Sequence, residues 1–124
     1  WALSPMANSG HDGWYNALAV DAQGHVHTAT FDPGGFNGVG VNYGVWDGTS
    51  WDVELAVPGS FDYAGGMSLA LADDGTSYVA FFDDVQGVAR LAWRDGPGGS
   101  WSDQVVEPRE SLVEVGRFPD IAID

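Results

Sequence analysis

Short apolar and aromatic runs alternate with Asp- and Gly-containing turns along nearly the whole chain. The runs are rich in β-branched and aromatic residues, which favours strands, and none has the i, i+3, i+4 spacing of a helix. Segments such as Asp21–Gly24 and Asp47–Ser50 have the composition of tight hairpin turns. The pattern therefore predicts eight strands, at 17–20, 25–31, 41–46, 51–57, 67–72, 77–82, 88–94 and 101–106.

The two halves of the chain repeat one pattern at an offset of 51 residues. Without a gap, Leu18 falls on Leu69 and Phe31 falls on Phe82. A third copy begins at residues 119–124. A period of about 50 residues is typical of propellers and other repeat arrays.

The repeat predicts an all-β fold, a β-propeller segment of four-stranded antiparallel blades within one domain, 1–124. Full blades are expected at about 15–57 and 67–107, an outer strand of a partial blade at 1–4, and an inner strand at 119–124. A sheet with two apolar faces cannot bury both alone, so the blades should stack face to face. The side chains expected to pack them together are Leu18, Val20, Phe31, Trp46, Leu69, Leu71, Phe82 and Trp93.

Two blades are too few for a complete propeller, which needs about four to eight. The missing blades could come from the same longer chain or from identical copies of this one. We favour the longer chain, because open blade faces would be large apolar patches on a lone monomer. The absence of an initiating Met also favours a partial or processed product.

Several strings resemble known propeller families. The string Ser68-Leu-Ala-Leu-Ala-Asp-Asp-Gly75, the strand 78–83 and the segment 92–101 resemble repeats of secreted bacterial propellers of the sialidase-like, Asp-box-related group. The turn Trp46-Asp-Gly-Thr-Ser-Trp51 is similar to turns of fucose-binding propeller lectins. The resemblance implies a blade fold, a secreted, periplasmic or cell-surface location, and glycans as a candidate ligand.

The charge balance excludes some functions. Eighteen Asp and Glu residues stand against four Arg and no Lys, giving a net charge of −14. Such a chain repels nucleic acid phosphates and anionic lipid heads, so neither nucleic acid binding nor membrane insertion is expected. The lack of Lys and Cys removes lysine nucleophiles, Walker-type phosphate loops, thiolates and disulfides.

Loop length predicts which end of the blades binds a ligand. The turns joining first to second and third to fourth strands are short, whereas the opposite end carries longer loops at 5–16, 32–40, 57–66, 83–87 and 107–118. Long loops on a rigid scaffold commonly hold binding residues. A mix of aromatic, carboxylate and amide side chains there suits sugars, although the alternative, that the aromatics anchor the loops on the blade edges, is favoured over binding. The candidate ligand-binding residues are His11, Asp12, Trp14, Asp32, Phe36, Asn37, Asp62, Tyr63, Asp83, Asp84 and Arg117.

Metal binding has weaker sequence support. His25 and His27 share one face of a strand, as metal ligands can, but the second repeat has Tyr78 in place of His27, which favours a structural slot. Asp83 and Asp84 could offer oxygens to Ca²⁺, the one candidate cofactor, but turn-forming Asp needs no metal. No other cofactor is expected.

The sequence contains no Gly-x-Ser-x-Gly motif and no cysteine nucleophile, and paired catalytic carboxylates cannot be assigned from it. The expected function is therefore a non-catalytic, secreted or cell-surface recognition or scaffolding module with glycans as candidate ligands. Two alternatives stay open: a fragment of a propeller glycoside hydrolase or lyase, and a structural subunit of an extracellular assembly.

Overall fold

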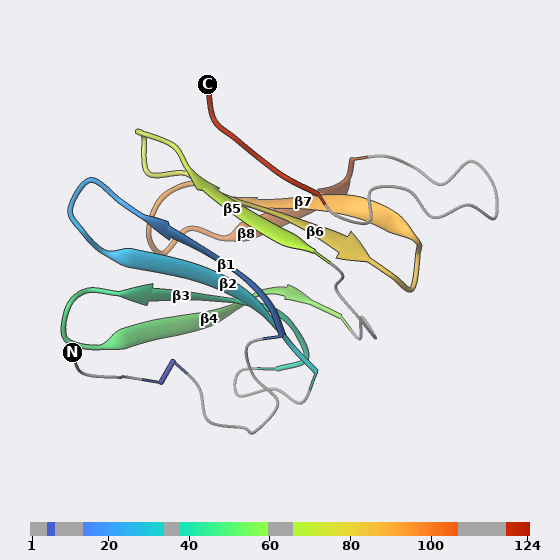
Figure 1. Cartoon of the computed structure of the whole chain (residues 1–124), viewed down its shortest axis with the longest axis horizontal. Helices are drawn as coiled ribbons and strands as arrows, with labels where there is room; N and C mark the ends of the chain where they lie inside the picture. Colours follow the sequence, from blue (N-terminus) through green and yellow to red (C-terminus); the bar gives the residue numbers. More distant parts are fainter. Residues whose placement is uncertain (1–4, 7–13, 34–37, 60–65, 107–118) are drawn as a thin grey trace.

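Two four-stranded antiparallel sheets form the structure, a computed structural model that describes residues 5–6, 14–33, 38–59, 66–106 and 119–124 (Figure 1). The N-terminal sheet contains β1 (Trp14–Val20), β2 (Val26–Asp32), β3 (Gly40–Trp46) and β4 (Trp51–Pro58). The C-terminal sheet contains β5 (Met67–Leu71), β6 (Ser77–Asp83), β7 (Val88–Arg94) and β8 (Trp101–Val105). In both sheets the spatial order follows the chain order.

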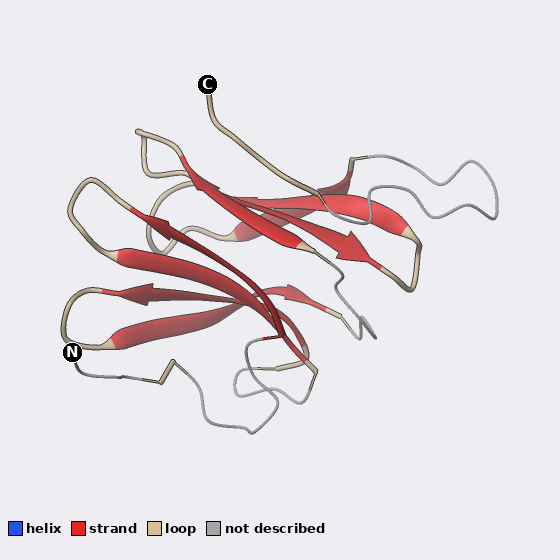
Figure 2. Ribbon diagram, in the orientation of Figure 1, coloured by secondary structure: helices blue, strands red, loops and turns tan. Residues whose placement is uncertain are grey.

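The all-β prediction is confirmed: Figure 2 shows strands and connecting loops, and no helix occurs among the described residues. All eight predicted strands are present, most with bounds within one residue of those expected. A helix long and apolar enough to cross a membrane is likewise not found in the described ranges.

The largest difference in bounds is at the start of β1. The sequence pattern predicts a loop as far as Asn16, but the strand begins at Trp14. Trp14 pairs with Phe31 and Asn16 with Thr30, so Tyr15 is an extra residue in the ladder, with a φ of 49°. Such a bulge interrupts the period-two pattern, which is why the sequence pattern missed this part of the strand.

The short turns lie at one end of the molecule, toward the left in Figure 1. Their Asp side chains close them as predicted from composition. Asp21 Oδ1 accepts hydrogen bonds from the amides of Gln23 and His25, and Asp47 Oδ1 accepts them from Thr49 and Ser50. These turns are therefore held by local side-chain bonds, which need no metal.

The sheets stack on one another, with β1 next to β5 and β4 in contact with β8 (Figure 1). Between them lies one cluster of buried apolar side chains, of which Phe31, Val41, Tyr43, Val79 and Phe81 are fully buried. Met67, Leu69 and Trp101 pack against its margin. Face-to-face packing of the two repeats is thus confirmed.

Several of the side chains expected in this packing are elsewhere. Leu18 and Val20 are 64% and 58% exposed, because Leu18 pairs with Thr28 on the face that points away from the C-terminal sheet. Phe82 is buried but lies outside the cluster between the sheets. The half-buried residues Leu71, Trp46 and Trp93 are also outside it. Only Phe31 and Leu69 take the expected place.

The end of the chain runs beside β5 (Figure 1). Ser68 Oγ donates to Asp120 Oδ1 at 2.8 Å, and the Ile121 amide donates to Ser68 Oγ at 3.2 Å. Residues 119–124 form no strand, in contrast to the predicted inner strand of a third blade. Residues 1–4, the predicted outer strand, lie outside the described residues, and the described strands do not close into a ring.

Candidate functional site

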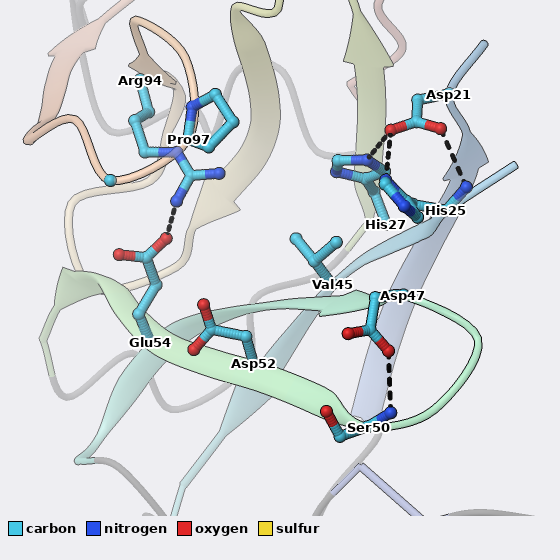
Figure 3. Close-up of a pocket in the computed structure, with 11 residues that line it drawn as sticks. Asp21, His25, His27, Val45, Asp47, Ser50, Asp52, Glu54, Arg94 and Pro97 are labelled. Atoms are coloured by element: carbon cyan, nitrogen blue, oxygen red, sulfur yellow. Dashed lines mark hydrogen bonds and ion pairs between the residues drawn. The ribbon is translucent and has the colours of Figure 1, made fainter. Parts of the chain in front are cut away.

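A cavity of about 300 Å³ opens at the end that carries the short turns (Figure 3). The N-terminal sheet contributes side chains from β2, β3, β4 and the turns beside them, and the C-terminal sheet contributes the end of β7 and the β7–β8 turn. The lining residues are Asp21, His25, His27, Val45, Asp47, Ser50, Asp52, Glu54, Arg94, Pro97 and Gly98. This is the end opposite to the long loops from which the sequence predicted ligand binding.

One wall of the cavity is formed by Asp21 and two imidazoles. Asp21 Oδ2 lies 3.1 Å from both His25 Nδ1 and His27 Nε2. Both His side chains are on the same side of the hairpin, as the His-x-His spacing predicted (Figure 3). The hairpin turn brings Asp21 back over the start of β2, so that one carboxylate serves both rings.

The Asp21 carboxyl is held in its ionised form. Desolvation raises its pKa, but the hydrogen bond with His27, the backbone amides of His25 and Gln23 and the charge of His25 outweigh this and lower the pKa to about 2. The Asp21 carboxylate is therefore negatively charged throughout the neutral and mildly acidic range.

A chain of hydrogen bonds leads from this wall into the core. His27 Nδ1 contacts the Tyr43 hydroxyl, and that hydroxyl lies 2.8 Å from Ser77 Oγ in the opposite sheet. Because the Asp21 carboxylate can only accept, His27 Nε2 donates to it, and in the neutral ring Nδ1 then accepts from Tyr43. Tyr43 in turn accepts from Ser77. Burial raises the pKa of the Tyr43 phenol, which keeps its proton available for this chain.

The opposite wall is the buried side chain of Arg94, which is 5% exposed. Its guanidinium stacks on the rings of Tyr43 and Trp101, 4.9 and 5.5 Å from their centroids, and pairs with Glu54 of the other sheet. Arg94 Nε has no hydrogen-bond partner among the described residues. Stacking and ion pairing thus fix Arg94 across the junction of the two sheets.

The floor and rim are formed by the β3–β4 hairpin. Asp47 Oδ1 accepts from the amides of Ser50 and Thr49, and these bonds lower the pKa of its carboxyl. Asp52 projects toward the middle of the cavity in Figure 3. Asp47 therefore adds a second fixed negative charge to that of Asp21.

Most of the predicted ligand-binding residues lie outside the described residues, namely His11, Asp12, Phe36, Asn37, Asp62, Tyr63 and Arg117. Trp14 starts β1, and Asp32 and Asp83 end β2 and β6. Asp32 and Asp83 are only 2% and 1% exposed, so neither carboxylate faces solvent. Neither Asp32 nor Asp83 lines the cavity.

Asp83 has a structural role in its loop. Its Oδ1 accepts from the Gln86 amide at 3.0 Å, and its Oδ2 pairs with Arg90 at 3.1 Å. Asp84, which follows it, is half-buried. Within the ranges that the structure describes, no group of three His, Asp or Glu side chains is arranged to hold a metal ion. Neither Asp83 with Asp84 nor Asp21 with its two imidazoles belongs to such a group.

Sequence reasoning missed Asp47, Asp52, Glu54 and Arg94 as site residues. One signal was available: the two repeats differ where the cavity lies. His27 corresponds to Tyr78 at the offset of 51 residues, and Arg94 corresponds to Trp46, because Arg94 pairs with Ser77 as Trp46 pairs with the equivalent Val26. Such a difference marks positions whose role is not simply that of building each sheet.

No family model matches the sequence, and no curated protein is significantly similar to it.

Proposed function

We propose that the chain is a segment of a β-propeller that acts as a non-catalytic recognition or scaffolding module, secreted, periplasmic or on the cell surface. The location follows from the resemblance to secreted bacterial propellers. The propeller is supported by the way in which the repeats stack, and one observation carries it: a side chain that packs against the core in one sheet has an exposed equivalent in the other.

The two sheets meet through different faces. The N-terminal sheet contributes Ala29 and Phe31 to the core, whereas the C-terminal sheet contributes Val79 and Phe81. At the offset of 51 residues, Val79 and Phe81 correspond to Thr28 and Thr30, the alternate positions of β2. Since alternate side chains of a strand point to opposite faces, the sheets stack front to back, as successive blades do.

Front-to-back stacking leaves a second face of the same kind uncovered. Leu69 packs against the core, and its equivalent Leu18 is 64% exposed. Leu71 is half-buried, and its equivalent Val20 is 58% exposed. This Leu18–Val20 patch, defined by these two residues, is where the repeat predicts another sheet, from a longer chain or from a second copy.

The test is the mass of the chain in solution as a function of concentration. We expect self-association of the wild type, because the patch has no covering sheet, and expect Leu18→Ser/Val20→Ser to shift it to monomer. Val85→Ser/Val106→Ser, which removes two other exposed apolar side chains, 62% and 57% exposed, should associate like the wild type. A wild type that stays monomeric and whose patch binds no apolar dye would contradict the proposal.

A further inference from the structure

The cavity at the short-turn end is built by both sheets rather than by one surface loop. Arg94 comes from the C-terminal sheet and Glu54 from the N-terminal sheet, and their ion pair crosses the junction (Figure 3). Arg94 is more than nine-tenths buried and leaves its Nε unpaired within the described part of the chain. A volume of about 300 Å³ is at the lower end of the range for small-ligand sites, about 300–1,000 Å³.

The charge of the lining selects the ligand. Asp21, Asp47, Asp52 and Glu54 supply four carboxylates, against one guanidinium that is already paired with Glu54. The pKa values of both Asp21 and Asp47 lie below the ordinary value, for the reasons given above, so these two remain ionised. An anionic ligand is therefore repelled, and a cation is attracted.

The geometry favours an organic cation over a metal ion. Asp21 Oδ2 is shared by two imidazoles, and Asp47 Oδ1 accepts from two amides. Neither carboxylate is therefore part of a ready set of metal ligands. The Asp52 carboxylate has no hydrogen-bond or ion-pair partner among the described residues. It can therefore receive an ammonium group without breaking a bond of the protein.

The polar walls also suit a hydroxyl group beside the ammonium. Ser50 supplies a hydroxyl, and the imidazole of His25, which bonds Asp21 through Nδ1, lines the same space. We propose that this cavity binds a small protonated amine with a neighbouring hydroxyl, and that an amino sugar is the carbohydrate form of this ligand. The inference rests on the proposed recognition function, since it names the ligand class of that module.

Backbone amide chemical shifts of the chain, followed by NMR near neutral pH, test the proposal with three probes. Glucosamine carries both groups, N-acetylglucosamine keeps the ring but loses the charge, and ethanolamine keeps the amine and hydroxyl without the ring. We expect glucosamine to shift the amides around Asp52 and His27, and N-acetylglucosamine to bind at least about tenfold more weakly. Ethanolamine binding as tightly as glucosamine would support the amine site and reject the sugar form.

Variants separate the cavity from general attraction to an acidic protein. Asp52→Asn should weaken glucosamine binding about tenfold, whereas Asp73→Asn, an equal loss of charge in the exposed β5–β6 turn outside the cavity, should leave it unchanged. Equal effects of the two variants, equal binding of glucosamine and N-acetylglucosamine, or no binding of either amine would overturn the inference. The NMR shifts report on the cavity alone, whereas the mass in solution reports on stacking of the sheets. Failure of the amine-binding inference is therefore distinguishable from failure of the proposed function.

Discussion

At the residue scale, the polar chain from Asp21 through His27 and Tyr43 to Ser77 is the least repetitive part of a repetitive molecule. At the offset of 51 residues, Tyr78 stands in place of His27. This series of hydrogen bonds links a surface turn to the buried junction of the sheets, where Ser77 is 1% exposed. A buried polar group is tolerated only when it is hydrogen-bonded, so each member depends on its neighbours.

Replacement of Tyr43 by Phe tests this dependence. The substitution keeps the ring against Trp101 and Arg94 but leaves His27 Nδ1 and Ser77 Oγ without their shared partner. We expect a loss of about 1–3 kcal/mol in the free energy of unfolding, measured with urea. The matched control is Tyr78→Phe, at the half-buried equivalent of His27, which should cost no more than about 0.5 kcal/mol. Equal losses in both variants would show that the hydrogen bonds of Tyr43 add nothing to the stability of the fold.

Asp21 gives a prediction for acid. Its pKa in the folded chain is about 2, below the ordinary value of 3.8, so ionisation of this group favours the folded state. That contribution is fully present above about pH 4 and is lost as the pH falls through about 2. We therefore expect Asp21→Asn to be less stable than the wild type at pH 5 and to lose less stability between pH 4 and pH 2. Urea unfolding at several pH values measures both differences in stability. Parallel pH profiles of the variant and the wild type would contradict the lowered pKa of Asp21.

At the scale of elements, the pairing of β3 with β4 depends on one glycine. Gly40 has a φ of +147°, and a Cβ there would overlap the carbonyl oxygen of Val57 in the paired strand. Gly48, in the hairpin that joins the same strands, has a φ of +98° but open space around it. A substitution at Gly48 therefore tests the positive φ alone, whereas a substitution at Gly40 also tests the close approach of the Val57 carbonyl.

Substitution by Ala at each position makes that separation measurable. Gly40→Ala should destabilise the chain by at least about 3 kcal/mol, because the β3–β4 pairing must shift to remove the overlap. Gly48→Ala should cost only about 1–2 kcal/mol, the strain of a positive φ. Thermal or urea unfolding compares them, and a Gly40→Ala chain as stable as Gly48→Ala would contradict the described approach of the strands.

Most elements could be predicted from sequence because each signal was local. Turn residues such as Asp21 and Gly24 and the alternation within the strands mark hairpins without reference to the rest of the chain. The bulge at Tyr15 could not be predicted, because it depends on pairing between β1 and β2. Which face of a strand is covered depends on the neighbouring sheet, so the repeat alone placed Leu18 and Val20 in a core from which both are absent.

The candidate site was harder to predict for the same reason. Glu54 and Arg94 are 40 residues apart, in different sheets, and only stacking brings them together. Loop length pointed to the other end of the sheets, where many of the named residues lie outside the described ranges. The charges that dominate the cavity sit in short turns, whose Asp residues were explained by turn formation alone.

At the scale of the whole molecule, the acidic charge and the stacked sheets act together. A net charge of −14 on 124 residues disfavours close approach of copies, whereas the Leu18–Val20 patch favours it. The balance between them depends on salt, which screens the repulsion and leaves the apolar contact almost unchanged.

The front-to-back contact between the sheets has a consequence for growth. A twofold interface is complete once two copies have bound. A contact between two unlike surfaces leaves one such surface uncovered on every added unit, so another unit can bind there. Such a series ends only when the rotation per step returns to its origin and makes a closed circle; any other rotation yields a helical filament. The turn from one sheet to the next is thus the quantity that decides between a finite particle and a fibre.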